Sequence, residues 1–89
     1  MSEVCRFKFT TGITKELVEE NISIAIISAE CTFGQARVRL HASYVASDGG
    51  AVINVDSDVG EHIAQVFTGL MTRKIGEENF TVEWVKDKE

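Results

Sequence analysis

The chain has 89 residues, of which 44% are hydrophobic and 26% charged, a balance typical of one globular domain. Nine basic against fourteen acidic residues give a net charge of −5, which disfavours non-specific binding to nucleic acid or to anionic membranes. The longest nearly apolar run, 22–29, is far shorter than the roughly 20 residues of a membrane-spanning helix.

The first residues lack the basic start and the long apolar core of a secretory signal peptide. The chain has two cysteines, Cys5 and Cys31, so no disulfide framework is implied. We therefore expect a cytoplasmic protein in which both thiols are reduced and buried, with no cofactor and no metal site.

The first half of the chain predicts a strand followed by a helix. Apolar and polar residues alternate over 4–10, which is typical of a half-buried strand. Thr14 then resembles a helix N-cap, and a helix is expected to run to about Glu30. The β-branched residues of 22–27 also suit a strand, but a six-residue helix alone would be marginal, so we favour a continuous helix. Its apolar face would contain Leu17, Val18, Asn21, Ile22, Ala25 and Ala29.

The segment 35–44 shows the clearest alternation and predicts a second strand. Turn-forming residues at 47–50 and a third strand over 51–55 would complete a hairpin. In the second strand, one side would carry Val38, Leu40, Ala42 and Tyr44, and the other Arg37, Arg39, His41 and Ser43.

A second helix and a last strand follow the hairpin. Asp58 and Glu61 resemble a capping box, the apolar stripe ends near Lys74, and Gly76 suits the position just past the helix. Alternation over 80–85 predicts the final strand, whose core-facing side would carry Phe80, Val82 and Trp84.

The predicted order is therefore β-α-β-β-α-β over a single domain, 1–89. This is the order of the ferredoxin-like α+β fold, a four-stranded antiparallel sheet with two helices on one face. In that fold the first strand lies beside the third, and the second strand lies outside the third. The fold hosts many functions, so function has to be argued from individual residues.

The chain lacks the motifs of several families that share this architecture. The predicted open sheet face carries no aromatic residue on which an RNA-recognition motif could stack bases. Cys5 and Cys31 do not form the Cys-x-x-Cys loop of heavy-metal-associated domains. The loop at Gly12 has no arginine, unlike that of acylphosphatases, although a helix N-terminus there could hold an anion. Gly12 is also the one match to amino-acid-sensing ACT domains.

Catalytic and metal-binding constellations are not expected. No serine or cysteine lies in a recognised nucleophile motif, and His62 is predicted to be solvated on the second helix. Acidic residues at 56, 58 and 61 are interpreted as helix-capping groups rather than as metal ligands.

The alternation predicts one distinctive surface, a basic sheet face. It would carry Arg6, Lys8, Arg37, Arg39, His41 and Asn54, with Val52 and Val85 as an apolar centre. Such a face could be merely solvated, could meet the acidic residues of a second subunit, or could bind an anion through forked arginine contacts. Isoleucines that point several ways from the first helix also favour contact with another chain.

The sequence thus favours a small non-catalytic binding, regulatory or assembly module that acts as a homo-oligomer. The alternative is a ligand-sensing or enzymatic domain that binds a small anionic metabolite at a protomer interface. Candidate ligand-binding residues for that alternative are Arg6, Lys8, Thr11, Gly12, Thr14, Arg37, Arg39 and His41.

Overall fold

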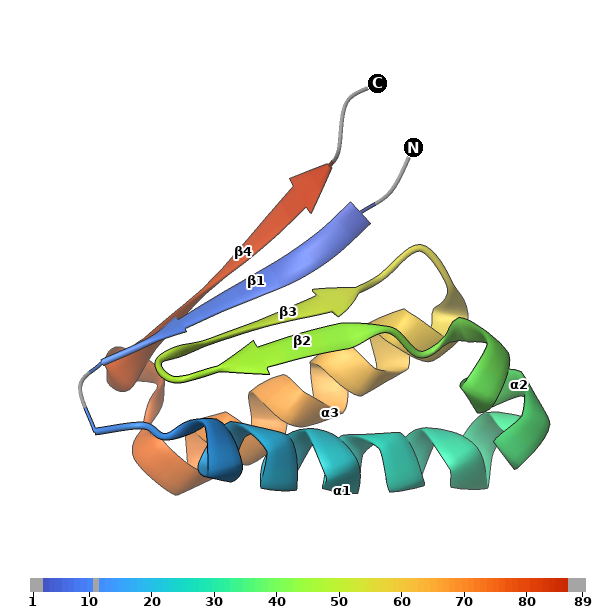
Figure 1. The fold of residues 1–89 in the computed structure, drawn as a ribbon, viewed down its shortest axis with the longest axis horizontal. Helices are drawn as coiled ribbons and strands as arrows, with labels where there is room; N and C mark the ends of the chain where they lie inside the picture. The colour runs from blue at the N-terminus through green and yellow to red at the C-terminus, as the bar shows by residue number, and fades with distance from the viewer. Residues whose placement is uncertain (1–2, 11, 87–89) are drawn as a thin grey trace.

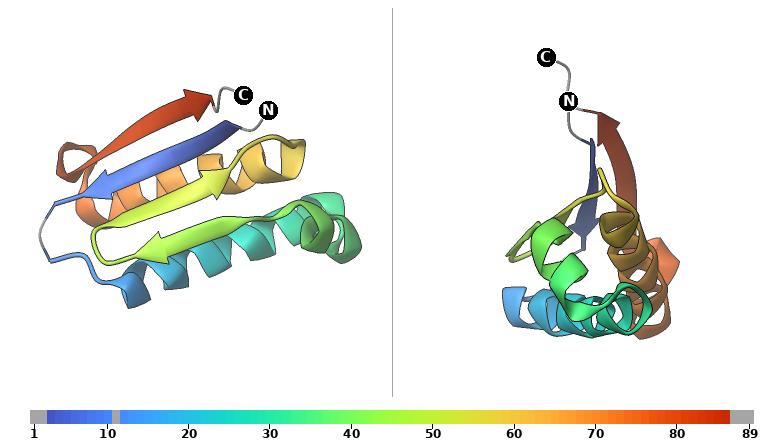
Figure 2. Two further views of the ribbon diagram at one scale, coloured as in Figure 1. Left: turned by 45° about the horizontal axis from the view of Figure 1, so that its top comes forward. Right: turned by 90° about the vertical axis from the view of Figure 1, so that its right-hand side faces the viewer.

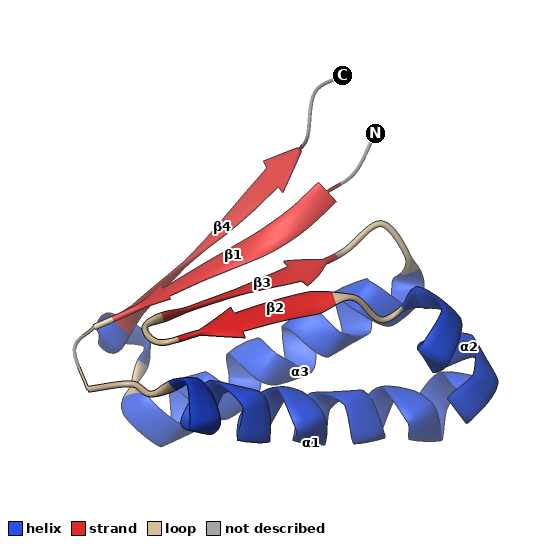
Figure 3. Cartoon of the chain, viewed as in Figure 1, coloured by secondary structure: helices blue, strands red, loops and turns tan. Residues whose placement is uncertain are grey.

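A computed structural model describes residues 3–10 and 12–86 of the chain (Figures 1 and 3). The described part is an α+β domain with a four-stranded antiparallel sheet. Its elements are β1 (Glu3–Phe9), α1 (Lys15–Phe33), α2 (Gln35–His41), β2 (Tyr44–Ser47), β3 (Gly50–Asn54), α3 (Asp58–Ile75), the 3-10 turn η1 (Glu77–Asn79) and β4 (Phe80–Lys86).

The strand order in the sheet is β2-β3-β1-β4. The first strand therefore lies beside the third, with the second strand outside, as the sequence predicted. Helices α1 and α3 lie side by side and cover one face of the sheet, and the other face is open (Figure 2). Within the described ranges, no helix combines the length and the apolar character that crossing a membrane requires.

The helical interpretation of 22–27 is confirmed. Thr14 caps α1, where its side-chain oxygen accepts a hydrogen bond from the Leu17 backbone N–H at 3.2 Å. Of the expected apolar face of α1, Leu17 is only partly buried. The other five residues are buried as expected: Val18, Asn21, Ile22, Ala25 and Ala29. The helix continues past Glu30 to Phe33 and ends at Gly34, whose φ of 94° favours glycine.

The expected strand over 35–44 is wrong. Residues 35–41 form helix α2, and β2 begins only at Tyr44. Glutamine, alanine, arginine and leucine all favour helix, and the segment has only one β-branched residue, Val38, to favour a strand. Val38 is also the one buried residue of α2, whereas Leu40 is 80% exposed. The alternation of apolar residues was therefore a coincidence of spacing over one short helix.

Helix α3 is confirmed, with a different cap. The N-cap is Ser57, whose hydroxyl oxygen accepts a hydrogen bond from the Gly60 N–H, so the expected capping box of Asp58 and Glu61 is wrong by one residue. Both acids still lie in the first turn, where the helix dipole favours them. The helix ends at Ile75, and Gly76, with φ 86°, follows it as the C-cap, as predicted.

The core lies between the sheet and the two long helices, and aromatic rings form its centre. The rings of Phe7 on β1 and Phe67 on α3 meet edge to face, with centroids 4.9 Å apart. Phe9 and Phe80 pack beside them at one end of the sheet. Such edge-to-face pairs stabilise a core beyond the area that they bury.

The core does not extend along the whole of β4. Phe80, Val82 and Trp84 lie on the helix-facing side of the strand, because they are paired with Phe9, Phe7 and Cys5. Only Phe80 is buried; Val82 is 43% and Trp84 52% exposed. β4 twists away from the helices toward its C-terminal end (Figure 1), so the expectation that all three belong to the core is only partly met.

Candidate functional site

The open face of the sheet carries part of the predicted basic surface. Strand register places Arg6 of β1 between Val52 of β3 and Glu83 of β4, and places Val4 beside Val85. Arg6, Val52 and Val85 are therefore on the open face, as predicted. Valines occupy much of this face, so it is more apolar than the sequence indicated.

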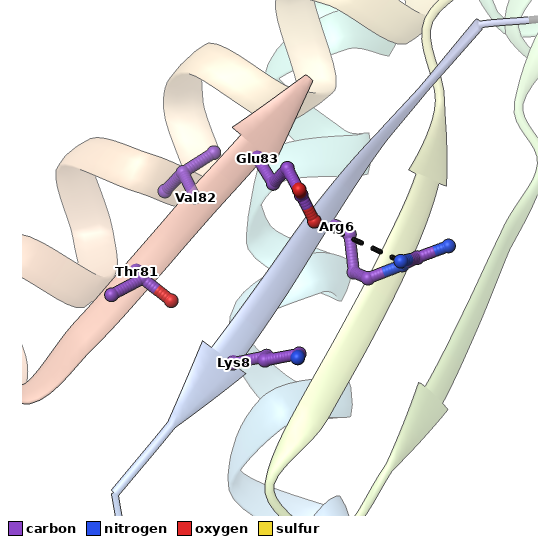
Figure 4. A pocket seen from close by; sticks show the side chains of 5 residues that line it. All are labelled: Arg6, Lys8, Thr81, Val82 and Glu83. Carbon is purple, nitrogen blue, oxygen red and sulfur yellow. Dashed lines mark ion pairs between the residues drawn. The ribbon is translucent and has the colours of Figure 1, made fainter. Parts of the chain in front are cut away.

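A shallow cavity of about 320 Å³ lies on this face over β1 and β4. Figure 4 shows its charged members, Arg6 and Lys8 of β1 and Glu83 of β4. The Arg6 guanidinium lies 3.7 Å from the Glu83 carboxylate, and both side chains are about half exposed or more. The carboxylate offsets one of the two positive charges, which weakens the attraction of this cavity for an anion. The lining residues are Arg6, Lys8, Thr81, Val82 and Glu83.

Arg37, Arg39 and His41 do not belong to this face, which corrects the predicted basic surface. They lie on α2, which joins α1 to β2 beyond one end of the sheet (Figure 1). The Arg37 guanidinium lies 5.0 Å from the centre of the Phe33 ring and 4.0 Å from Asp58. The structure therefore separates the predicted ligand-binding residues into at least two groups.

The loop between β1 and α1 is held by hydrogen bonds to the turn that joins β2 to β3. The Lys15 N–H donates to the Asp48 carboxylate at 2.7 Å, and the Ile13 carbonyl accepts from the Gly49 N–H at 3.1 Å. The Asp48 carboxylate therefore occupies the N-terminus of α1, which is the position at which the sequence suggested that an anion could bind. Gly12 has φ 95° and Thr14 is the N-cap, whereas Thr11 lies outside the described residues.

His62 is not the solvated side chain that the sequence predicted. It is half-buried between the two long helices, with its Nε2 atom 3.0 Å from the Ser28 hydroxyl oxygen on α1. The Phe33 ring meets the imidazole edge to face at 5.5 Å. Among the described residues, no carboxylate is hydrogen-bonded to this imidazole, so the pair lacks the orienting acid of a catalytic triad. The polar contact instead joins α1 to α3.

The two cysteines differ in environment. Cys5 is buried in the sheet, as expected, but Cys31 is exposed on α1, which corrects the prediction that both are buried. Burial raises the pKa of the Cys5 thiol above its usual value, and the negative charge of Glu61 raises it further. Cys5 is therefore a protonated, inert thiol at neutral pH.

We expect a chromogenic thiol reagent at pH 7.5 to modify one cysteine per folded chain quickly, because only the Cys31 thiol is accessible. Cys5 should react only after the chain is unfolded in urea. Cys31→Ser should abolish the fast phase, and Cys5→Ser should preserve it. A fast phase that survives Cys31→Ser would contradict this assignment.

Residues 3–10 and 12–86 contain no group of three or more histidine, cysteine, aspartate or glutamate side chains placed to hold a metal ion. Comparison of the chain with models of protein families, with curated proteins and with solved structures found no match.

Proposed function

We propose that this chain is a small non-catalytic binding or assembly module that acts as a homo-oligomer. The observation that carries the proposal is the exposure of large apolar side chains, above all Val82 and Trp84 on the helix-facing side of β4. Large apolar patches on a small domain are typical of interaction surfaces. Other exposed apolar residues are Ile24, Ile27, Leu40, Tyr44 and Val45.

We further infer a ferredoxin-like architecture in which α2 is an additional short helix. The strand order and the position of α1 and α3 on one face support this inference. Two free thiols, Cys5 and Cys31, favour a reducing compartment, and we propose the cytoplasm.

Light scattering of the purified chain at low and at high salt tests the proposal. We expect a mass of at least two chains that persists in high salt, because contacts between apolar side chains are not screened by ions. An oligomer that dissociates in high salt would move the interface to the charged residues of the open sheet face. A monomer under both conditions, over the whole accessible concentration range, would contradict the proposal.

The alternative function, binding of a small anionic ligand, is favoured by the cavity that contains Arg6 and Lys8. Titration with inorganic phosphate, followed by amide chemical shifts, tests it. Saturable shifts confined to 6–8 and 81–83 that disappear in Lys8→Ala would support ligand binding. Small, unsaturable shifts would contradict it.

A further inference from the structure

The central strand β1 divides its backbone hydrogen bonds between its two neighbours in a fixed alternation. The Glu3 carbonyl accepts from the Val55 N–H at 2.9 Å, and the Phe9 N–H donates to the Gly49 carbonyl at 3.0 Å. In an antiparallel ladder, residues that bond to one neighbour alternate with residues that bond to the other. The odd-numbered residues of β1 therefore bond to β3, and the even-numbered residues bond to β4.

The same alternation determines which backbone groups of β4 are left at the edge of the sheet. The Thr10 N–H donates to the Asn79 carbonyl at 3.0 Å, which places the odd-numbered residues of β4 in hydrogen-bonded pairs with β1. The N–H and C=O groups of Val82 and Trp84 consequently point away from β1. These two residues thus combine outward-facing backbone groups with exposed apolar side chains.

The sequence of β4 protects this edge by one central charge, Glu83, whose carboxylate lies 3.7 Å from the Arg6 guanidinium of β1. Natural edge strands avoid pairing with other chains by being very short, by carrying proline or central charges, or by a bulge. β4 has seven residues and pairs continuously with β1, and the chain contains no proline. The opposite edge strand, β2, has only four residues.

We propose that β4 pairs antiparallel with β4 of a second copy of this chain, around a twofold axis at Val82. The proposal rests on the homo-oligomer proposed above and gives its interface. The sheet would continue through both copies, with all helices on the same side. Val82 then lies opposite the partner's Val82, and Phe80 opposite the partner's Trp84, so apolar side chains meet on the helix-facing side. On the open face, Thr81 lies opposite the partner's Glu83.

The charges of β4 favour this register over its neighbours. A twofold axis at Glu83 would place the two Glu83 carboxylates directly opposite each other, which is destabilising in a sheet. An axis at Trp84 would place the apolar Val82 opposite the partner's Lys86. An axis at Thr81 also separates the carboxylates, but it places Trp84 opposite the partner's Glu78, before the start of β4. Among these four registers, the axis at Val82 alone separates the carboxylates and pairs both Val82 and Trp84 with apolar residues of the partner strand.

Val82→Lys tests the interface, because it places two ammonium groups opposite each other across the axis. We expect the dimer dissociation constant to rise by roughly 10- to 100-fold, measured by sedimentation over a concentration series. Val45→Lys is the matched control, since Val45 is exposed on the other edge strand, β2. It should leave the dissociation constant unchanged, and circular dichroism should show that both variants are folded.

Hydrogen exchange of the unmodified chain gives a readout that does not depend on a variant. The amides of Val82 and Trp84 should become protected as the protein concentration rises, because only the partner strand can bond to them. The amides of Thr81 and Glu83 bond to β1 and should be protected at every concentration.

The outcomes separate the two proposals. A dimer that survives Val82→Lys, with the Val82 and Trp84 amides unprotected, would overturn the β4 interface and leave the homo-oligomer proposal standing. A chain that is monomeric at all concentrations would overturn both. If Val45→Lys raised the dimer dissociation constant as much as Val82→Lys does, the interface would lie elsewhere or would use both edges of the sheet. That result would overturn pairing through β4 alone.

Discussion

Gly60→Ala is expected to destabilise the protein by about 3 kcal/mol or more, a large part of the roughly 5–15 kcal/mol that stabilises an ordinary domain. Gly60 lies in the first turn of α3, directly against the end of β3. A Cβ atom there would overlap the Asn54 carbonyl oxygen and also approach the Val55 backbone at 3.1 Å. Backbone atoms cannot turn aside as a flexible side chain can, so α3 would have to move off the sheet.

Gly69→Ala is the matched control, because it makes the same change in the same helix. Apart from its chain neighbours and the backbone of its own helix, no atom lies within 4 Å of the position that its Cβ would take. Alanine favours helix over glycine, so this variant should gain about 0.5–1 kcal/mol. Urea unfolding followed by circular dichroism measures both changes. Similar effects of the two substitutions would contradict the close contact of α3 with β3.

Phe67→Ala should cost about 3–5 kcal/mol, because it leaves a cavity at the centre of the core. Phe67 is fully buried, and its ring meets Phe7 and Phe9 edge to face at 4.9 Å and 6.2 Å. Leu40→Ala removes a large apolar side chain that is 80% exposed and should change stability by less than about 0.5 kcal/mol. Equilibrium unfolding in urea gives the free energy of unfolding of both variants and of the unmodified chain. A loss below about 1 kcal/mol for Phe67→Ala would contradict this packing.

Local signals predicted most of the fold. Thr14, Gly76 and the turn at 48–49 lie where their cap and turn chemistry indicated, because these motifs depend on a few neighbouring residues. The segment 35–44 failed for the opposite reason. A seven-residue helix spans about two turns, too short for its period to be distinguished from the alternation of a strand.

The candidate sites were harder to predict, because they depend on contacts between distant segments. Alternation correctly assigned Trp84 to the helix-facing side of β4, but only the twist of the sheet determines that the helices leave it uncovered. The contact of His62 with Ser28 likewise joins α3 to α1 through two residues that are 34 positions apart in the sequence. Arg37 and Arg39 were both wrongly assigned to the open sheet face, because both assignments depended on the single prediction of a strand over 35–44.

The pairing of β1 with β4 has a consequence for the order of folding. Residues near the two ends of the described chain are partners in this pair, since Glu3 aligns with Lys86 and Phe9 with Phe80. During synthesis β1 therefore leaves the ribosome before its partner β4, and until β4 follows, β1 is itself an edge strand of the sheet. Pairs of such long sequence separation form late and slow the search for the native state. In a nascent or truncated chain that ends before Phe80, the backbone groups of β1 that normally bond to β4 would be unpaired. Such an exposed strand edge favours binding by chaperones or aggregation.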